Sequence, residues 1–178
     1  MHSPSQMSDK IYNVLFLCTG NSARSILAEA LLTRWARGRF RGFSAGSQPK
    51  GEVHPMALQL LARYKLPTEG LRSKSWDEFT SAGDDVPVMD FVFTVCDNAA
   101  GEVCAAWPGR PITARWPIRD PVTSQSTELE QEQAFREAMT SLENRIKIFT
   151  SLPIAALDRV ALQQRLDGIG QPEPQKNV

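Results

Sequence analysis

The sequence predicts one α/β domain built on a parallel sheet of four strands. Short apolar runs rich in β-branched and aromatic residues alternate along the chain with segments whose apolar residues recur every three or four positions. Strands that alternate with helices in this way are typical of a parallel sheet made from right-handed crossovers. The chain has 178 residues, 42% of them hydrophobic, which is enough for one domain with a sizeable core.

The first strand is expected over residues 11–17, because a nearly continuous apolar run is typical of a strand buried on both faces. A helix is expected next over residues 26–35, where apolar side chains recur at helical spacing. Residues 41–45 form a short candidate strand. These elements predict a strand, a helix and a second strand at the start of the domain.

The middle of the domain continues the alternation. A second amphipathic helix is expected over residues 57–64, with His54 in a structural role at its start. Ser75 and Glu78 have the spacing of a capping box, which predicts a short helix there. Two further strands are expected, a strong one over residues 88–95 and a weaker one over residues 112–116.

The domain is predicted to span residues 11–150 and to end in a long helix over residues 135–149. Residues 1–10 are polar, and we interpret them as a flexible tail. Residues 151–178 form a C-terminal extension. In it we expect one more helix, starting at Pro153 and running through Leu166, and then a disordered end.

The composition excludes several classes of function. Twenty basic and 20 acidic side chains cancel, so no global field attracts the chain to nucleic acid or to a membrane surface. No apolar run has the length of a transmembrane helix, and the first ten residues lack the apolar stretch of a secretory signal. We therefore expect a cytoplasmic, monomeric protein. Its three cysteines are expected to be reduced at rest.

The strongest functional signal is the segment CTGNSAR, residues 18–24, which joins the first strand to the first helix. The N–H groups and the dipole at a helix N-terminus bind anions, and successive loop N–H groups can form a nest around a tetrahedral oxyanion. Gly20 is expected to supply the freedom for that curl, and Arg24 offers a planar fork for two oxygens. The same positive field favours the thiolate of Cys18. A cysteine that served only as a small core residue would not need these neighbours.

The candidate site therefore combines a nucleophile with an oxyanion cradle. Ser22 and Ser25 can donate hydroxyl hydrogen bonds to the sulfur of Cys18, and Asn21 can brace the loop through its amide. The candidate oxyanion-binding residues are Thr19, Gly20, Asn21, Ser22, Ala23, Arg24 and Ser25.

The run VLFLCTGNSARSILAEALL resembles the start of the low-molecular-weight protein tyrosine phosphatase superfamily, whose signature is a cysteine, five residues and an arginine–serine pair. The resemblance covers residues 11–150 and includes the pair Asp120–Pro121. It implies a four-stranded parallel sheet with helices on both faces and Asp120 as the general acid. An Asp–Pro pair alone is weak evidence, since most such pairs start turns, and only the upstream loop makes Asp120 a candidate.

Two branches of this superfamily share the loop. The phosphatases place aromatic residues after the Asp–Pro pair, whereas the corresponding stretch here, DPVTSQS, has none. The segments SAGSQPKGEVHP, GLRSKSWDEF and TVCDNAAGEVC resemble the arsenate reductase branch instead. The resemblance therefore implies reduction of arsenate. The alternatives are a low-molecular-weight phosphatase acting on phosphotyrosine or a small phosphoester, and a non-catalytic module that binds oxyanions.

Reduction of arsenate to arsenite takes two electrons, which gives further thiols a purpose. The resemblance implies that Cys18 attacks arsenate and that a second thiolate then attacks the Cys18 sulfur. Cys96 resembles the resolving cysteine of thioredoxin-coupled reductases, and Cys104 resembles the one that completes their disulfide cascade, although the seven residues between them are slightly more than in that type. The alternative is that both are passive and a small thiol attacks directly. The expected reductant is thioredoxin, glutathione with glutaredoxin, or another low-molecular-weight thiol.

Two departures from that branch bear on the site. Some of its members carry a cysteine where this chain has Ala23, so this chain cannot use that thiol. Some also bind a structural potassium ion near the positions of Asn21, Glu29 and Ser44, completed by an aspartate. Lys74 aligns with that aspartate, and its ammonium is expected to take the place of the ion. We therefore predict no metal and no bound cofactor.

Overall fold

The computed structural model describes residues 10–80, 83, 85–96, 107–122 and 126–171 of the chain. Its centre is a four-stranded parallel sheet in the order β2–β1–β3–β4. The strands are β1 (Tyr12–Cys18), β2 (Phe40–Gly46), β3 (Phe91–Cys96) and β4 (Ile112–Ile118). The predicted fold class is confirmed.

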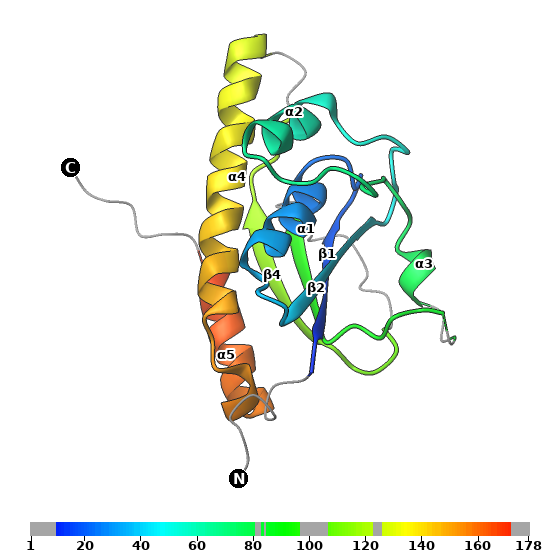
Figure 1. The fold of residues 1–178 in the computed structure, drawn as a ribbon, viewed down its shortest axis with the longest axis vertical. Coiled ribbons are helices and arrows are strands. Elements are labelled where there is room, and N and C mark those ends of the chain that lie inside the picture. Colours follow the sequence, from blue (N-terminus) through cyan, green and yellow to red (C-terminus); the bar gives the residue numbers. More distant parts are fainter. Residues whose placement is uncertain (1–9, 81–82, 84, 97–106, 123–125, 172–178) are drawn as a thin grey trace, which may run out of the picture.

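Helices cover the sheet unequally on its two faces (Figure 1). The helices are α1 (Arg24–Trp35), α2 (Pro55–Arg63), α3 (Asp77–Thr80), α4 (Glu128–Thr150) and α5 (Arg159–Ile169), with a 3-10 turn at Ile154–Ala156. The long helix α4 runs beside α1 on one side of the sheet, and the short helix α3 lies on the opposite side.

Alternating side chains of the strands supply a core on each face. On the larger face Phe16, Phe93 and Trp116 are buried with the apolar sides of α1 and α4, and the rings of Phe93 and Trp116 stack with centroids 3.9 Å apart. On the smaller face Leu15 and Val92 pack with Phe79 of α3 and their neighbours. Burial on both faces explains the continuous apolar run of the central strand β1.

Two strands differ from the prediction at their ends. The third strand begins at Phe91 and not at Val88, which is 54% exposed. Met89 and Asp90 lie between Val88 and Phe91, and the Asp90 carboxylate accepts the backbone N–H of Asn13 at 2.8 Å. The fourth strand continues through Pro117 to Ile118, which is compatible with its place at the edge of the sheet.

The C-terminal helix begins later than predicted. Pro153 precedes only the 3-10 turn, and α5 starts at Arg159 because Asp158 caps it by accepting the N–H of Ala161 at 2.7 Å. The indole N–H of Trp116 donates to the carbonyl of Leu166 at 3.0 Å, so α5 is tied to β4. No helix in the described ranges is long and apolar enough to cross a membrane.

Candidate active site

The loop between β1 and α1 lies at the carboxyl edge of the sheet, where Cys18 ends β1 and Arg24 begins α1. Cys18 pairs in register with Gly46, the last residue of β2. A side chain at Gly46 would meet the carbonyl oxygen of Thr19 at 2.5 Å. The loop therefore turns closely over the end of β2, and only glycine leaves room for it.

The backbone of the loop turns at Asn21, which has φ 43. The expectation that Gly20 supplies the unusual conformation was wrong, since Gly20 is not among the residues with positive φ. Asparagine tolerates this region because its short amide side chain can hydrogen-bond locally. The Asn21 amide does so in both directions: its oxygen accepts the backbone N–H of Lys74 at 2.9 Å, and its nitrogen donates to the Ser25 hydroxyl at 2.8 Å.

These two hydrogen bonds determine the donor-to-acceptor direction along the chain of hydrogen bonds that ends at the sulfur of Cys18. A backbone N–H can only donate, so the Asn21 atom facing Lys74 is the oxygen, and the atom facing Ser25 is the nitrogen. The Ser25 hydroxyl accepts from that nitrogen, which leaves its own hydrogen for the Cys18 sulfur 3.0 Å away. The hydroxyl therefore presents a donor to the sulfur, and a hydrogen bond of this kind is stronger to a thiolate than to a thiol.

Arg24 projects from the start of α1 toward the end of β4. One nitrogen of its guanidinium donates to the carbonyl of Ile118 at 2.9 Å, and the other lies 3.7 Å from the carboxylate of Asp120. The Asp120 carboxylate is half exposed and accepts the N–H of Val122 at 3.0 Å. The structure therefore brings the guanidinium of Arg24 and the carboxylate of Asp120 together, although 96 positions separate the two residues in the sequence.

A cavity of about 530 Å³ opens over this loop. It is lined by Cys18, Thr19, Gly20, Ser22, Ala23, Arg24, Gln48, Lys50, Asp120 and Val122. Sequence reasoning missed Gln48 and Lys50. They follow β2, and the N–H of Lys50 donates to the carbonyl of Gly20 at 3.0 Å. The signal was available, because the loop after a strand parallel to β1 must start at the same edge of the sheet.

The sequence profile of the low molecular weight phosphotyrosine protein phosphatases matches residues 13–162, most of the chain. The chain belongs to this family. It is 31% identical to an arsenate reductase of Oceanobacillus iheyensis over 143 residues, which are 80% of this chain and 96% of that protein.

Solved structures of arsenate reductases are similar to this fold over most of the chain. The arsenate reductase of Archaeoglobus fulgidus superimposes with a TM-score of 0.61 at 28% identity, covering 78% of this chain and 99% of that one. The thioredoxin-dependent arsenate reductase Cg_ArsC1' of Corynebacterium glutamicum gives a TM-score of 0.56 at 26% identity, covering 80% of this chain and 62% of that one. Within the phosphatase family the chain is thus similar to arsenate reductases.

Cys96 is the second thiol of the described chain. It ends β3, the strand beside β1, and its side chain is buried in the same hydrophobic cluster as that of Cys18. Neither Cys18 nor Cys96 forms a disulfide. The prediction that Cys104 acts with Cys96 falls on a residue outside the described ranges. Cys18 and Cys96 therefore share one face at one edge of the sheet, which is the placement that a relay between them requires.

A buried lysine, Lys74, and a partly buried glutamate, Glu29, lie beside the loop. The Lys74 ammonium is 3.9 Å from the Glu29 carboxylate, which also accepts the hydroxyl of Ser44 at 2.5 Å. Burial raises the pKa of Glu29 and lowers that of Lys74, while the attraction between the two opposes both shifts. Among the described residues, no group of three or more His, Cys, Asp and Glu side chains could hold a metal ion.

His54 has a structural role at the start of α2, as the sequence predicts. Its Nδ1 accepts the N–H of Met56 at 3.1 Å, and its ring packs against Phe135 of α4 with centroids 4.8 Å apart. The backbone N–H of His54 donates to the carbonyl of Ser22 at 2.8 Å, so the residue that caps α2 also holds the oxyanion loop.

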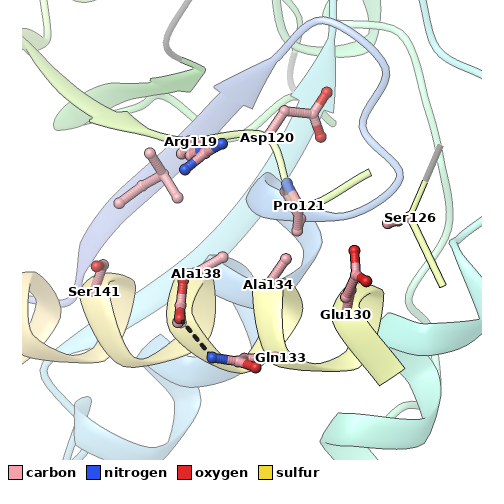
Figure 2. Close-up of a pocket in the computed structure, with 11 residues that line it drawn as sticks. Arg119, Asp120, Pro121, Ser126, Glu130, Gln133, Ala134, Ala138 and Ser141 are labelled. Atoms are coloured by element: carbon pink, nitrogen blue, oxygen red, sulfur yellow. Dashed lines mark hydrogen bonds between the residues drawn. The ribbon is translucent and has the colours of Figure 1, made fainter. Parts of the chain in front are cut away.

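A second cavity, of about 390 Å³, lies on the other side of Asp120 (Figure 2). Figure 2 shows Arg119 and Asp120 on one side of it and the α4 residues Glu130, Ala134 and Ser141 on the other. Asp120 is thus a lining residue of both cavities.

Proposed function

We propose that this chain is an arsenate reductase that reduces arsenate to arsenite through Cys18. The observation that carries the proposal is one cavity in which a thiol, an oxyanion cradle and a carboxylate converge, with a second thiol at the end of the next strand. A hydrolase has no use for that second thiol, whereas a two-electron reduction needs one. Relatives about 30% identical over most of their length carry the name arsenate reductase.

In the first step the thiolate of Cys18 attacks the arsenic of arsenate. A sulfur–arsenic bond forms and the bond from arsenic to one of its hydroxyl groups breaks, and the departing hydroxyl takes a proton from Asp120 to leave as water. Arg24 and the loop N–H groups hold the remaining oxygens. Arsenic is still As(V) in this thiol–arsenate adduct.

In the second step another thiolate attacks the sulfur of Cys18. A disulfide forms, the sulfur–arsenic bond breaks, and its electron pair stays on arsenic, which leaves as arsenite. The two electrons come from the two thiols that become the disulfide. We assign the second thiol to Cys96, because it lies at the end of the strand next to the nucleophile.

The disulfide must be reduced before the next turnover. We propose that Cys104 attacks Cys96 and regenerates the Cys18 thiol, and that thioredoxin then reduces the pair Cys96–Cys104. The similarity to a thioredoxin-dependent arsenate reductase supports this donor. The alternative donor is glutathione with glutaredoxin, or another small thiol that attacks the Cys18 adduct directly. Since each turnover consumes reduced thiols, the cytoplasm is the proposed compartment.

Purified protein given arsenate tests the proposal. Arsenite is measured separately with thioredoxin and its reductase, with glutathione and glutaredoxin, and with another small thiol, while phosphotyrosine hydrolysis is measured in parallel. We expect arsenite with at least one donor and slow phosphotyrosine turnover, because no aromatic residue follows Pro121 in DPVTSQS. Phosphotyrosine turnover much faster than arsenate reduction would instead identify the chain as a phosphatase.

A further inference from the structure

Three polar residues form a row beside the nucleophile. Asn21, Ser25 and Glu29 are spaced four apart, and from Ser25 to Glu29 the chain is helical, so their side chains lie on one face of α1 and of the loop that enters it. Asn21 and Ser25 belong to the hydrogen-bond chain that ends at Cys18. Glu29 is the next residue of the row, but it has no part in the proposed reaction.

A single residue of a distant segment contacts both ends of this row. The backbone N–H of Lys74 binds the Asn21 oxygen at 2.9 Å, and the Lys74 ammonium lies 3.9 Å from Glu29. The ammonium also donates to the carbonyl of Arg72 at 2.9 Å, within its own segment. The Lys74 side chain is only 8% exposed, so water screens this pair poorly.

The segment around Lys74 makes further hydrogen bonds to the end of β2 and to the oxyanion loop. The carbonyl of Lys74 accepts the N–H of Gly46 at 2.9 Å, and the hydroxyl of Ser73 donates to the carbonyl of Gly20 at 3.2 Å. The segment therefore forms a wall along the oxyanion loop. The ion pair between Lys74 and Glu29 connects this segment to α1. The first turn of α1 carries Arg24 and Ser25.

We propose that Lys74 is a positioning residue for Cys18: its ammonium neutralises Glu29 and thereby holds its backbone N–H where it orients Asn21, Ser25 and the sulfur. The ammonium is thus a built-in structural cation of the active-site loop. The inference rests on the proposed role of Cys18 as nucleophile.

Loss of the ammonium is expected to weaken the whole chain of contacts. The Glu29 carboxylate, whose side chain is 19% exposed, loses its nearest counter-charge and keeps only the weaker attraction of Arg72. The segment around Lys74 then moves until more water reaches the carboxylate. The Lys74 N–H then no longer selects one orientation of the Asn21 amide, and Ser25 donates to sulfur less of the time. The thiolate of Cys18 is destabilised even though no group that touches it has been changed.

The experiment measures the rate of Cys18 alkylation by iodoacetamide against pH, in a Cys96→Ser, Cys104→Ser background. Adding Lys74→Ala should move the midpoint of the profile to higher pH and slow alkylation near neutral pH by about tenfold, the loss of one hydrogen bond to a charged group. Lys147→Ala, an exposed lysine on α4, is the matched control and should leave the profile unchanged. The readout needs no arsenate, so it can fail while the proposed function stands.

Chemical rescue makes the test specific for the cation. Ammonium chloride should restore most of the alkylation rate of Lys74→Ala. Sodium chloride and tetramethylammonium chloride at equal ionic strength should not. The sodium ion is strongly hydrated, and the tetramethylammonium ion is too large for the space that the lysine side chain leaves. The wild-type protein should respond to none of the three. An unchanged profile in folded Lys74→Ala, or equal rescue by all three salts, would overturn the proposal.

A second comparison covers the case in which Lys74→Ala does not fold. Lys74→Arg keeps the positive charge and should retain the wild-type midpoint. The double variant Lys74→Met, Glu29→Gln removes both charges and leaves neither unpaired, so it should fold but alkylate with a raised midpoint. Identical midpoints in the wild type and both variants would refute a role for the ammonium.

Discussion

The guanidinium of Arg24 lies 3.7 Å from the carboxylate of Asp120. It also donates at 2.9 Å to the carbonyl of Ile118, two residues before Asp120. A single side chain from the start of α1 thus holds the end of β4 and the loop that carries the acid. Arg24 therefore has two tasks in the proposed mechanism, binding oxyanion oxygens and keeping Asp120 at the mouth of the cavity.

Replacement of Arg24 by lysine is expected to lower kcat/KM for arsenate by roughly a hundredfold or more, since a point charge cannot replace a bidentate fork. Steady-state arsenite production measures it. Arg34→Lys is the matched control, because Arg34 also lies on α1 and also donates to a backbone carbonyl, that of Tyr64. Equal effects of the two substitutions would mean that Arg24 only stabilises the fold.

Ser25→Ala is expected to slow the step at Cys18 by about tenfold, because the thiolate loses its hydroxyl donor. The pH midpoint of Cys18 alkylation should rise in parallel. Ser22→Ala is the comparison, since Ser22 is held through its backbone carbonyl, which accepts the N–H of His54 at 2.8 Å. If Ser22→Ala had the larger effect, the hydroxyl chain through Ser25 would not support the nucleophile.

Local signals predicted much of the site. A buried strand, a cysteine, five residues and an arginine at a helix start are contiguous, so Cys18 and Arg24 could be assigned from the sequence before any tertiary contact was known. The contact from Lys74 to Asn21 spans 53 positions, and that from Arg24 to Ile118 spans 94. Such partners depend on how the chain returns to the carboxyl edge of the sheet, which composition and spacing do not specify.

Errors in the sequence prediction came from side-chain chemistry that competes with backbone rules. Glycine was expected to make the turn in the loop, but Asn21 makes it, because its amide has partners on both sides. Pro153 was expected to start a helix, but the carboxylate of Asp158 is the better cap. Gln48 and Lys50 were missed as lining residues of the cavity, although they follow a strand that ends at the same edge of the sheet as β1.

His54 should make stability depend on pH. Burial and the nearby charge of Lys50 lower its pKa from 6.5, and its Nδ1 must be unprotonated to accept the N–H of Met56. The unfolded chain then binds a proton more readily than the folded one, so the stabilisation is full above about pH 6.5 and is lost as the pH falls further. His54→Asn keeps a capping group that does not titrate. Urea denaturation should show a smaller loss of stability from about pH 7.5 to pH 5.5 in His54→Asn than in the wild type.

Cys104→Ser should trap the first disulfide of the proposed relay. After a single turnover with arsenate, mass spectrometry of non-reduced peptides should find Cys18 joined to Cys96, because nothing remains to pass that bond onward. Their Cα atoms would then lie roughly 4.4 to 6.8 Å apart. Near-normal activity of both Cys96→Ser and Cys104→Ser with a small thiol would replace the relay by direct attack on the Cys18 adduct.

The central claim is that Cys18 is the nucleophile of a reduction, and Cys18→Ser tests it most directly. The serine hydroxyl stays protonated near neutral pH, so the loop should still bind an oxyanion while the attacking group is lost. We expect arsenite production by Cys18→Ser to fall to background with every thiol donor, with an unchanged fold by circular dichroism and retained phosphate binding by calorimetry. Substantial arsenite production by this folded variant would contradict the mechanism.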